Sequence, residues 1–127
     1  MAGEPILVID DHAPTCKLVR VLLEGEGYEV RSAPDAESAL ALLESYRPQL
    51  ILMDIRLPGM DGLTLTRTIK ADPSLSGVAI IAFTSYAMKG DEERMLAAGC
   101  DGYIAKPIDT RRLARRIASY LSGVTSD

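Results

Sequence analysis

Residues 50–55 read Leu-Ile-Leu-Met-Asp-Ile, an aliphatic run that one carboxylate interrupts. Successive apolar residues without alternation are typical of a parallel strand that is covered on both faces. A charged carboxylate is costly in such surroundings, so turn formation alone explains Asp54 poorly. The stretch therefore predicts a buried central strand that carries a functional group at its carboxyl end.

Similar aliphatic runs recur along the chain and alternate with helical segments. Two further continuous runs cover residues 6–9 and 78–83, whereas residues 28–31 alternate apolar with polar side chains, as an edge strand does. Residues 103–105 form a short last strand. This alternation indicates repeated βαβ units, so the sequence predicts an α/β fold with a doubly wound five-stranded parallel sheet and five helices.

Helical periodicity predicts one broad apolar face on the first, second and last helices. The first helix stops before Gly25, and the second begins near Asp35 and ends before Pro48. The apolar face expected on the first helix consists of Cys16, Leu18, Val19, Val21, Leu22 and Leu23.

The last helix is expected to follow Asp109 as its cap. Its outer face is basic and carries Arg111, Arg112, Arg115 and Arg116. Residues 62–71 and 90–98 are weaker helices, and the second of them has only Met95, Leu96 and alanines to bury.

Composition narrows the class of protein. A chain of 127 residues with 47% hydrophobic and 25% charged residues is typical of one soluble globular domain. No apolar run approaches the roughly 20 residues of a spanning helix, and no secretory signal precedes the first strand, so a cytoplasmic protein without a membrane partner is expected. The net charge of −4 disfavours direct nucleic-acid binding. Cys16 and Cys100 are expected to be buried free thiols.

Polar residues stand where the apolar runs end. In an open parallel sheet, ligands bind outside the carboxyl ends of the strands. The residues at those ends are Asp10 and Asp11, Asp54, Thr84 and Ser85, and Lys106 and Pro107. Crowded acids repel one another unless a counter-charge is present, and hard oxygen donors suit Mg²⁺. An ammonium and a hydroxyl beside them suit the oxygens of a phosphoryl group.

Each of these residues has a simpler explanation when it is taken alone. Asp10 or Asp11 could form a turn or cap a helix, Lys106 could be a loop lysine, and Thr84 could be a β-branched strand residue. The functional interpretation is favoured because the whole set falls at one edge of the sheet under a single fold assignment.

The motifs at residues 8–11, 52–62, 82–85 and 102–107 resemble those of the receiver domain of two-component response regulators. They read Val-Ile-Asp-Asp, Leu-Met-Asp-Ile-Arg-Leu-Pro-Gly-Met-Asp-Gly, Ala-Phe-Thr-Ser and Gly-Tyr-Ile-Ala-Lys-Pro. The resemblance extends from Ile6 to about Leu121. It implies a single receiver domain with a flavodoxin-like sheet in strand order 2-1-3-4-5 and a cis bond between Lys106 and Pro107.

The resemblance implies that Asp54 is the phosphoacceptor and takes a phosphoryl group from the phosphohistidine of a histidine kinase or a histidine phosphotransfer protein. Lys106 would pair with the phosphoryl oxygens, and Thr84 would hydrogen-bond to them. The Mg²⁺ ligands that it implies are Asp10, Asp11, Asp54 and the backbone carbonyl of Arg56. Such a domain catalyses only its own phosphorylation and dephosphorylation, so no separate enzyme activity is expected.

The resemblance also implies a switch. Thr84 would move towards the phosphoryl group, and the aromatic residue of the last strand, Tyr103, would turn inward; the simpler alternative is a surface tyrosine. The face formed by the fourth helix, fifth strand and fifth helix would then bind a downstream protein. The arginines of the last helix either meet an acidic partner there or form a solvated face.

Neighbouring residues suggest smaller roles. His12 could touch the phosphodonor or simply be solvated. The resemblance places Arg56 and Tyr86 at variable positions that overhang the phosphate, and we expect them to slow hydrolysis by blocking water. Residues 87–94 resemble both single-domain cell-cycle regulators and receivers fused to hybrid kinases, so a stand-alone receiver and one cut from a larger kinase are both expected alternatives.

Two other classes of protein are consistent with the predicted fold. A flavodoxin-like electron carrier would need a hydroxyl-rich phosphate loop and aromatic residues against a flavin, and residues 12–16 offer little of either. An aspartyl phosphatase would need a second acid two residues after its nucleophile, where Arg56 stands instead.

Overall fold

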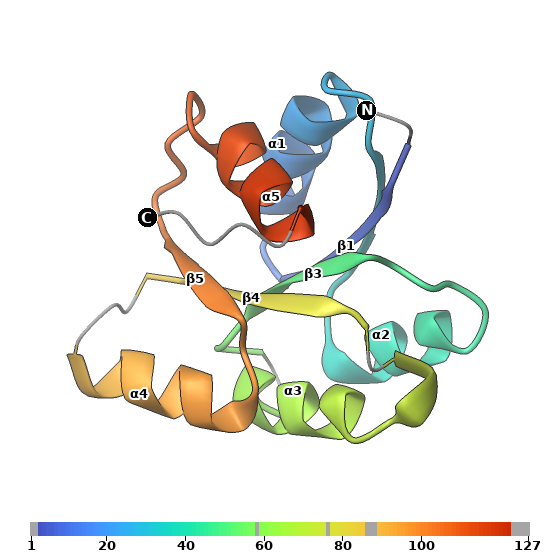
Figure 1. Cartoon of the computed structure of the whole chain (residues 1–127), viewed down its shortest axis with the longest axis vertical. Coiled ribbons are helices and arrows are strands. Elements are labelled where there is room, and N and C mark those ends of the chain that lie inside the picture. Colours follow the sequence, from blue (N-terminus) through green and yellow to red (C-terminus); the bar gives the residue numbers. More distant parts are fainter. Residues whose placement is uncertain (1–2, 58, 76, 86–88, 123–127) are drawn as a thin grey trace.

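A single parallel sheet organises the chain. The structure is a computed structural model that describes residues 3–57, 59–75, 77–85 and 89–122, with the backbone alone for residues 89–91. The strands lie in the order β2-β1-β3-β4-β5 (Figure 1). They are β1 (Pro5–Ile9), β2 (Glu29–Ala33), β3 (Leu50–Asp54), β4 (Ala79–Thr84) and β5 (Gly102–Ala105). The predicted fold class and strand order are confirmed.

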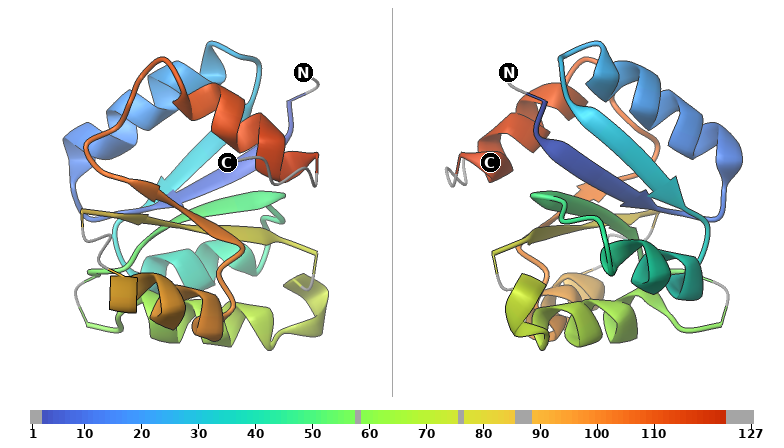
Figure 2. Two further views of the ribbon diagram at one scale, coloured as in Figure 1. Left: turned by 60° about the vertical axis from the view of Figure 1, so that its left-hand side comes forward. Right: turned by 90° about the vertical axis from the view of Figure 1, so that its right-hand side faces the viewer.

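The helices form a layer on each face of this sheet. They are α1 (Ala13–Glu24), α2 (Ala36–Leu43), α3 (Gly62–Lys70), α4 (Lys89–Ala98) and α5 (Leu113–Leu121), and a 3₁₀ turn, η1, covers Pro73–Leu75. α1 and α5 cover one face, and α2, α3 and α4 cover the other (Figures 1 and 2). None of the described helices combines the length and the apolar composition that a membrane-spanning helix requires.

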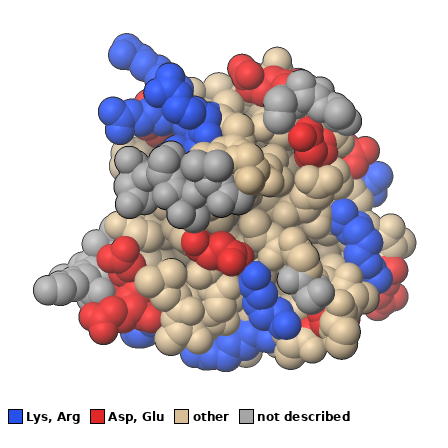
Figure 3. All heavy atoms as spheres, viewed as in Figure 1, with Lys and Arg blue, Asp and Glu red and all other residues tan. Residues whose placement is uncertain are grey.

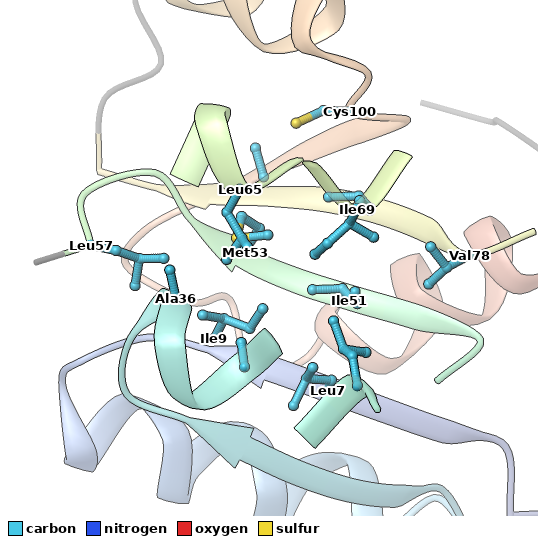
Figure 4. Close-up of a cluster of buried hydrophobic side chains, with 14 of the residues drawn as sticks. Leu7, Ile9, Ala36, Ile51, Met53, Leu57, Leu65, Ile69, Val78 and Cys100 are labelled. Atoms are coloured by element: carbon cyan, nitrogen blue, oxygen red, sulfur yellow. The ribbon is translucent and has the colours of Figure 1, made fainter. Parts of the chain in front are cut away.

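The central strands are buried on both faces, which explains their continuous aliphatic sequence. Leu7 and Ile51 belong to the cluster on the α2 and α3 side of the sheet, where Ile69 joins them (Figure 4). Their neighbours Ile6 and Leu50 belong to the cluster on the α1 and α5 side. Full burial of each such side chain contributes about 1.5–3 kcal/mol. Polar side chains therefore interrupt the apolar ones in the edge strand β2, which has exposed as well as buried positions.

The apolar face predicted for the first helix is too broad. Val19 and Leu23 are fully buried, but Leu18 is 40% exposed and Val21 is 60% exposed. A helix that lies on a sheet buries only a limited stripe of its surface, and these two residues fall beyond the edge of that stripe. The same correction applies on α4, where Met95 is buried and Leu96 is 54% exposed.

Two helix boundaries also differ from the prediction. α2 ends at Leu43, and Tyr46 is buried beyond it, with its hydroxyl donating to the carbonyl of Ile6 at 3.4 Å. Asp109 does not cap α5, because an extra turn intervenes: its carboxylate accepts the N–H of Arg111 at 3.0 Å, and α5 begins at Leu113.

The cysteines are free thiols, as predicted, but only one is fully buried. Cys100 lies in the core, whereas Cys16 is half-buried at the start of α1. Burial raises the pKa of both thiols, and the neighbouring Asp10 carboxylate raises that of Cys16 further.

Candidate functional site

Parallel register brings three acids to one edge of the sheet. Ile9 of β1 pairs with Met53 of β3, so Asp10 and Asp54 come at the same level of adjacent strands. Carboxylate oxygens of Asp10, Asp11 and Asp54 all lie within 4.8 Å of one another. We call these three residues the acidic cluster.

Asp10 is the most deeply held member of the acidic cluster. It is only 1% exposed. Its Oδ1 accepts the backbone N–H of His12 at 2.9 Å, and its Oδ2 accepts the ammonium of Lys106 at 2.7 Å. Both oxygens of this buried carboxylate are therefore hydrogen-bonded, which offsets the cost of removing its charge from water.

Asp54 is buried, yet its second oxygen is less engaged. Its Oδ1 accepts the backbone N–H of Arg56 at 3.0 Å, whereas its Oδ2 lies 3.9 Å from Nζ of Lys106. Burial raises the pKa of Asp54, and the carboxylates of Asp10 and Asp11 raise it further. The N–H of Arg56 and the ammonium of Lys106 lower it, and so favour the ionised form.

Lys106 reaches the acidic cluster from the end of β5. Its ammonium stands 4.9 Å from the ring centroid of Phe83, so an aromatic face as well as two carboxylates surrounds it. Its backbone N–H donates to the carbonyl of Thr84 at 2.8 Å, and the bond from Lys106 to Pro107 is cis.

The two residues predicted to form a switch lie on neighbouring strands. Thr84 ends β4 and is 3% exposed. Tyr103 of β5 is half-buried and packs against the core on the α4 side. The carbonyl of Tyr103 accepts the guanidinium of Arg116 at 2.8 Å, which ties β5 to α5.

A glycine allows α3 to start against the acceptor strand. A Cβ at Gly62 would clash with the carbonyl oxygen of Asp54 and lie 2.7 Å from Cα of Ile55. Asp61 caps this helix by accepting the N–H of Thr64 at 2.9 Å. Without a Cβ, α3 can come close enough for the N–H of Gly62 to donate to the carbonyl of Ile55 at 2.9 Å, which ties the start of α3 to the backbone that follows Asp54.

Other predicted residues lie further out. His12 is exposed, and instead of being merely solvated it caps α1 through Nδ1. Sequence reasoning missed this role, although Pro14 in the first turn was a signal for a helix start at this point. The side chain of Arg56 is exposed at the rim, and Tyr86 lies outside the described residues.

A hollow of about 820 Å³ lies between α4, β5 and α5. Blue side chains gather over the start of α5, at the upper left of Figure 3. Arg112, Arg115 and Arg116 line the hollow, and Arg111 does not. Tyr120 lies against Gly102 on its floor, where a Cβ would be 2.6 Å from the phenol ring. We call it the arginine-lined hollow.

A family model for the response regulator receiver domain matches residues 6–118. The chain belongs to the response regulator receiver family. The polar-differentiation response regulator DivK of Brucella anthropi is 44% identical to this receiver domain over 116 residues, which cover 91% of this chain and 94% of the relative.

Solved receiver structures agree with this assignment. The receiver domain of sensor histidine kinase PA1611 from Pseudomonas aeruginosa, solved with a magnesium ion in its active site cleft, has a TM-score of 0.84 and 38% identity, covering 96% of this chain and 99% of that one. A CheY-like receiver domain protein from Methanospirillum hungatei has a TM-score of 0.88 and 34% identity, covering 96% of both chains. The receiver domain thus belongs to two-component signalling and not to the electron carriers or aspartyl phosphatases.

Proposed function

We propose that residues 1–127 form a single receiver domain that accepts a phosphoryl group on Asp54 in the cytoplasm. The donor is the phosphohistidine of a histidine kinase or a histidine phosphotransfer protein. The observation that carries the proposal is the acidic cluster itself, in which buried Asp54 lies within 4.8 Å of two further carboxylates and 3.9 Å from an ammonium. Charge at this density suits a site that neutralises and orients a phosphoryl group.

The transfer needs little from the protein beyond a nucleophile and its surroundings. An Asp54 carboxylate oxygen bonds to phosphorus while the bond from phosphorus to the imidazole nitrogen of the donor breaks. The electron pair of that bond stays on the imidazole, and the product is an acyl phosphate. The ionised carboxylate is the attacking form, so the N–H of Arg56 at 3.0 Å and the nearby Lys106 serve the reaction by opposing the rise in the pKa of Asp54 that burial causes.

The acidic cluster fits Mg²⁺. Its donors are carboxylate oxygens, and the neighbouring thiol of Cys16 donates to the carbonyl of Asp10 while burial raises its pKa, so it stays a poor metal ligand. The ligands that we propose are Asp10, Asp11, Asp54 and the backbone carbonyl of Arg56. When bound, the ion neutralises the charges of the carboxylates and of the phosphoryl oxygens.

Lys106 and Thr84 complete the site. The ammonium of Lys106 is anchored on Asp10 at 2.7 Å and reaches the phosphoryl oxygens from there. The hydroxyl of Thr84 hydrogen-bonds to the same oxygens. Dephosphorylation follows when water attacks phosphorus and breaks its bond to the Asp54 oxygen, which releases inorganic phosphate. The domain thus acts chemically only on itself.

A second hollow next to the acidic cluster supports a protein as the phosphodonor. It has a volume of about 540 Å³ and lies between α1 and residues 32–34. Asp10 and Asp11 line one side of it, and Val21 lines another. Exposed Val21 of α1 therefore shares a hollow with two members of the acidic cluster, where it favours contact with an apolar side chain of the donor.

The arginine-lined hollow supports an output face formed by α4, β5 and α5. Tyr103 lines it three residues before Lys106, so a shift of Thr84 on phosphorylation and an inward turn of Tyr103 would reshape it. Among the described side chains of α4, at residues 92–98, only Met95 and Ala98 are buried, so this helix can follow at low cost. We propose that a downstream protein, and no nucleic acid or membrane, binds there, and that its contact surface is acidic.

The test is phosphorylation by a small-molecule phosphodonor in the presence of Mg²⁺, followed by intact-protein mass. The wild type should gain the mass of one phosphoryl group, and a chelator should prevent the gain. Asp54→Asn should gain nothing. The matched control is Asp61→Asn, which removes a neighbouring carboxylate and keeps a good helix cap, and should be phosphorylated normally. Phosphorylation of Asp54→Asn, or none in the wild type, would refute the proposal.

A further inference from the structure

The turn between β1 and α1 is held by its own hydrogen bonds. The N–H of His12 donates to Oδ1 of Asp10 at 2.9 Å. The carbonyl of His12 accepts the N–H groups of Thr15 and Cys16 at 3.1 and 3.2 Å, and the thiol of Cys16 donates to the carbonyl of Asp10 at 3.3 Å. The backbone of His12 thus links Asp10 to the first turn of α1 by hydrogen bonds.

The side chain of His12 adds a further link to α1. His12 occupies the N-cap of α1 in an extended conformation, and Nδ1 accepts the N–H of Thr15 at 3.3 Å. The same nitrogen lies 2.7 Å from the hydroxyl oxygen of Thr15. Asn, Asp, Ser and Thr are the usual caps, so an imidazole in this position replaces a conventional cap by a ring that bonds to two groups of one residue.

Asp11 depends on this turn more than its neighbours do. Asp10 and Asp54 each accept a backbone N–H and lie near the ammonium of Lys106. The exposed carboxylate of Asp11 makes no hydrogen bond or ion pair with any described residue, although its oxygen lies within 4.8 Å of the other two. Its direction is therefore set by the backbone on either side, which is Asp10 and His12.

We propose that His12 is a positioning residue of the magnesium site and holds Asp11 in the acidic cluster by capping α1. The inference rests on the proposed function, because it requires an ion at these carboxylates. Partners that orient the ligands of a metal typically change its affinity by about 10–100-fold. For a cap that acts through the backbone we expect the low end of that range.

The experiment is calorimetric titration of the full chain with Mg²⁺ alone. His12→Ala should weaken binding about tenfold, because the cap is lost. His12→Asn should bind within about twofold of the wild type, since its carbonyl oxygen can accept the same N–H. His12→Gly repeats the loss with a residue that N-caps tolerate, should the alanine variant fold poorly.

The matched control is Ser74→Ala, which removes a local side-chain hydrogen bond to Asp72 at the opposite edge of the sheet, before β4. It should leave the Mg²⁺ affinity unchanged. Wild-type affinity in both His12→Ala and His12→Gly, or failure of Asn to restore binding, would overturn the positioning role and leave the proposed function standing. A wild type that binds no Mg²⁺ would overturn the proposed metal site together with this inference.

Discussion

The acidic cluster binds Lys106, which follows β5, and the arginine-lined hollow lies against β5 itself, but the two regions hold their charges differently. In the cluster, Asp10 and Asp54 are 1% and 7% exposed and each accepts a backbone N–H. In the hollow, Arg112 approaches Asp109 only at 3.6 Å, with side chains that are 74% and 57% exposed. Arg115 makes no hydrogen bond or ion pair with the rest of the described chain.

This contrast indicates that the acidic cluster is suited to a chemical reaction and the arginine-lined hollow to binding a partner. Buried charges that the backbone holds keep their geometry before a ligand arrives, which suits group transfer. Exposed arginines such as Arg112 and Arg115 are screened by solvent, add little to stability and remain available to a partner. β5 joins the two regions, with Lys106 after its carboxyl end and Tyr103 in the hollow, so a change at one region has only a few residues to cross.

Loss of the Lys106 ammonium should have the largest effect, which we expect on the rate of phosphorylation. Lys106→Met keeps the aliphatic stem and should slow phosphorylation by a small phosphodonor about 100- to 1000-fold, as loss of a transition-state donor does. The rate is followed by intact mass. Lys17→Met makes the same charge change beside Asp10 and Asp11, in the hollow next to α1, and should stay near wild type. Equal losses in both would reduce the role of Lys106 to its net charge.

Alanine substitutions at one glycine in each region test how well each region accommodates an added methyl group. Gly62→Ala meets backbone atoms of Asp54 and Ile55, so it should destabilise the fold by about 3 kcal/mol. Gly102→Ala meets the ring of Tyr120, which can turn aside, and should cost about 1 kcal/mol. Urea unfolding measures both. Similar values would contradict the view that the site is the more rigid region.

Charge reversal should have a different effect on peptide binding at an arginine inside the arginine-lined hollow than at one outside it. Arg115→Glu should weaken binding of a labelled glutamate-rich peptide about tenfold, whereas Arg111→Glu, outside the hollow, should weaken it by less than about twofold. Fluorescence anisotropy measures the affinity, and both variants should be phosphorylated at the wild-type rate. Equal weakening would mean that the peptide responds to net charge and not to the hollow.

The smallest expected effect is on the free energy of unfolding, which the buried carboxylate of Asp54 lowers. The fold raises the pKa of Asp54 above its ordinary value of 3.8, so its ionised form destabilises the native state at neutral pH. In a chelator at pH 7, Asp54→Asn should be more stable than wild type by on the order of 1 kcal/mol. This advantage should shrink as the pH falls through the raised pKa and vanish below the ordinary one.

The exposed Asp109 provides the contrast for that measurement. Asp109→Asn should change the free energy of unfolding by at most about 0.5 kcal/mol at pH 7, because its side chain is 57% exposed. Thermal melts over a pH series measure both variants. An advantage for Asp54→Asn that persists in acid would show that its origin is not the buried charge.

Sequence alone predicted the sheet and the polar residues that meet at its edge, because the point where an aliphatic run ends can be read from a few consecutive residues. The continuous aliphatic run before Asp54 requires burial on both faces, and parallel strands present their carboxyl ends at one edge. Periodicity was a poorer guide to α1, since it ranks side chains by type and cannot tell how wide a stripe the sheet covers. Leu18 and Val21 were therefore expected in the core and are exposed.

The sequence by itself determined how strands and helices alternate along the chain and which polar residues stand at the strand ends, since propensity and hydrophobic period act over a few neighbouring residues. Tertiary structure alone decided which atoms meet: that Lys106 bonds to Asp10 at 2.7 Å and stands 3.9 Å from Asp54, and that Arg116 reaches the carbonyl of Tyr103. Such distances follow from how whole elements pack, because residues far apart in the chain share no local signal that would fix their separation.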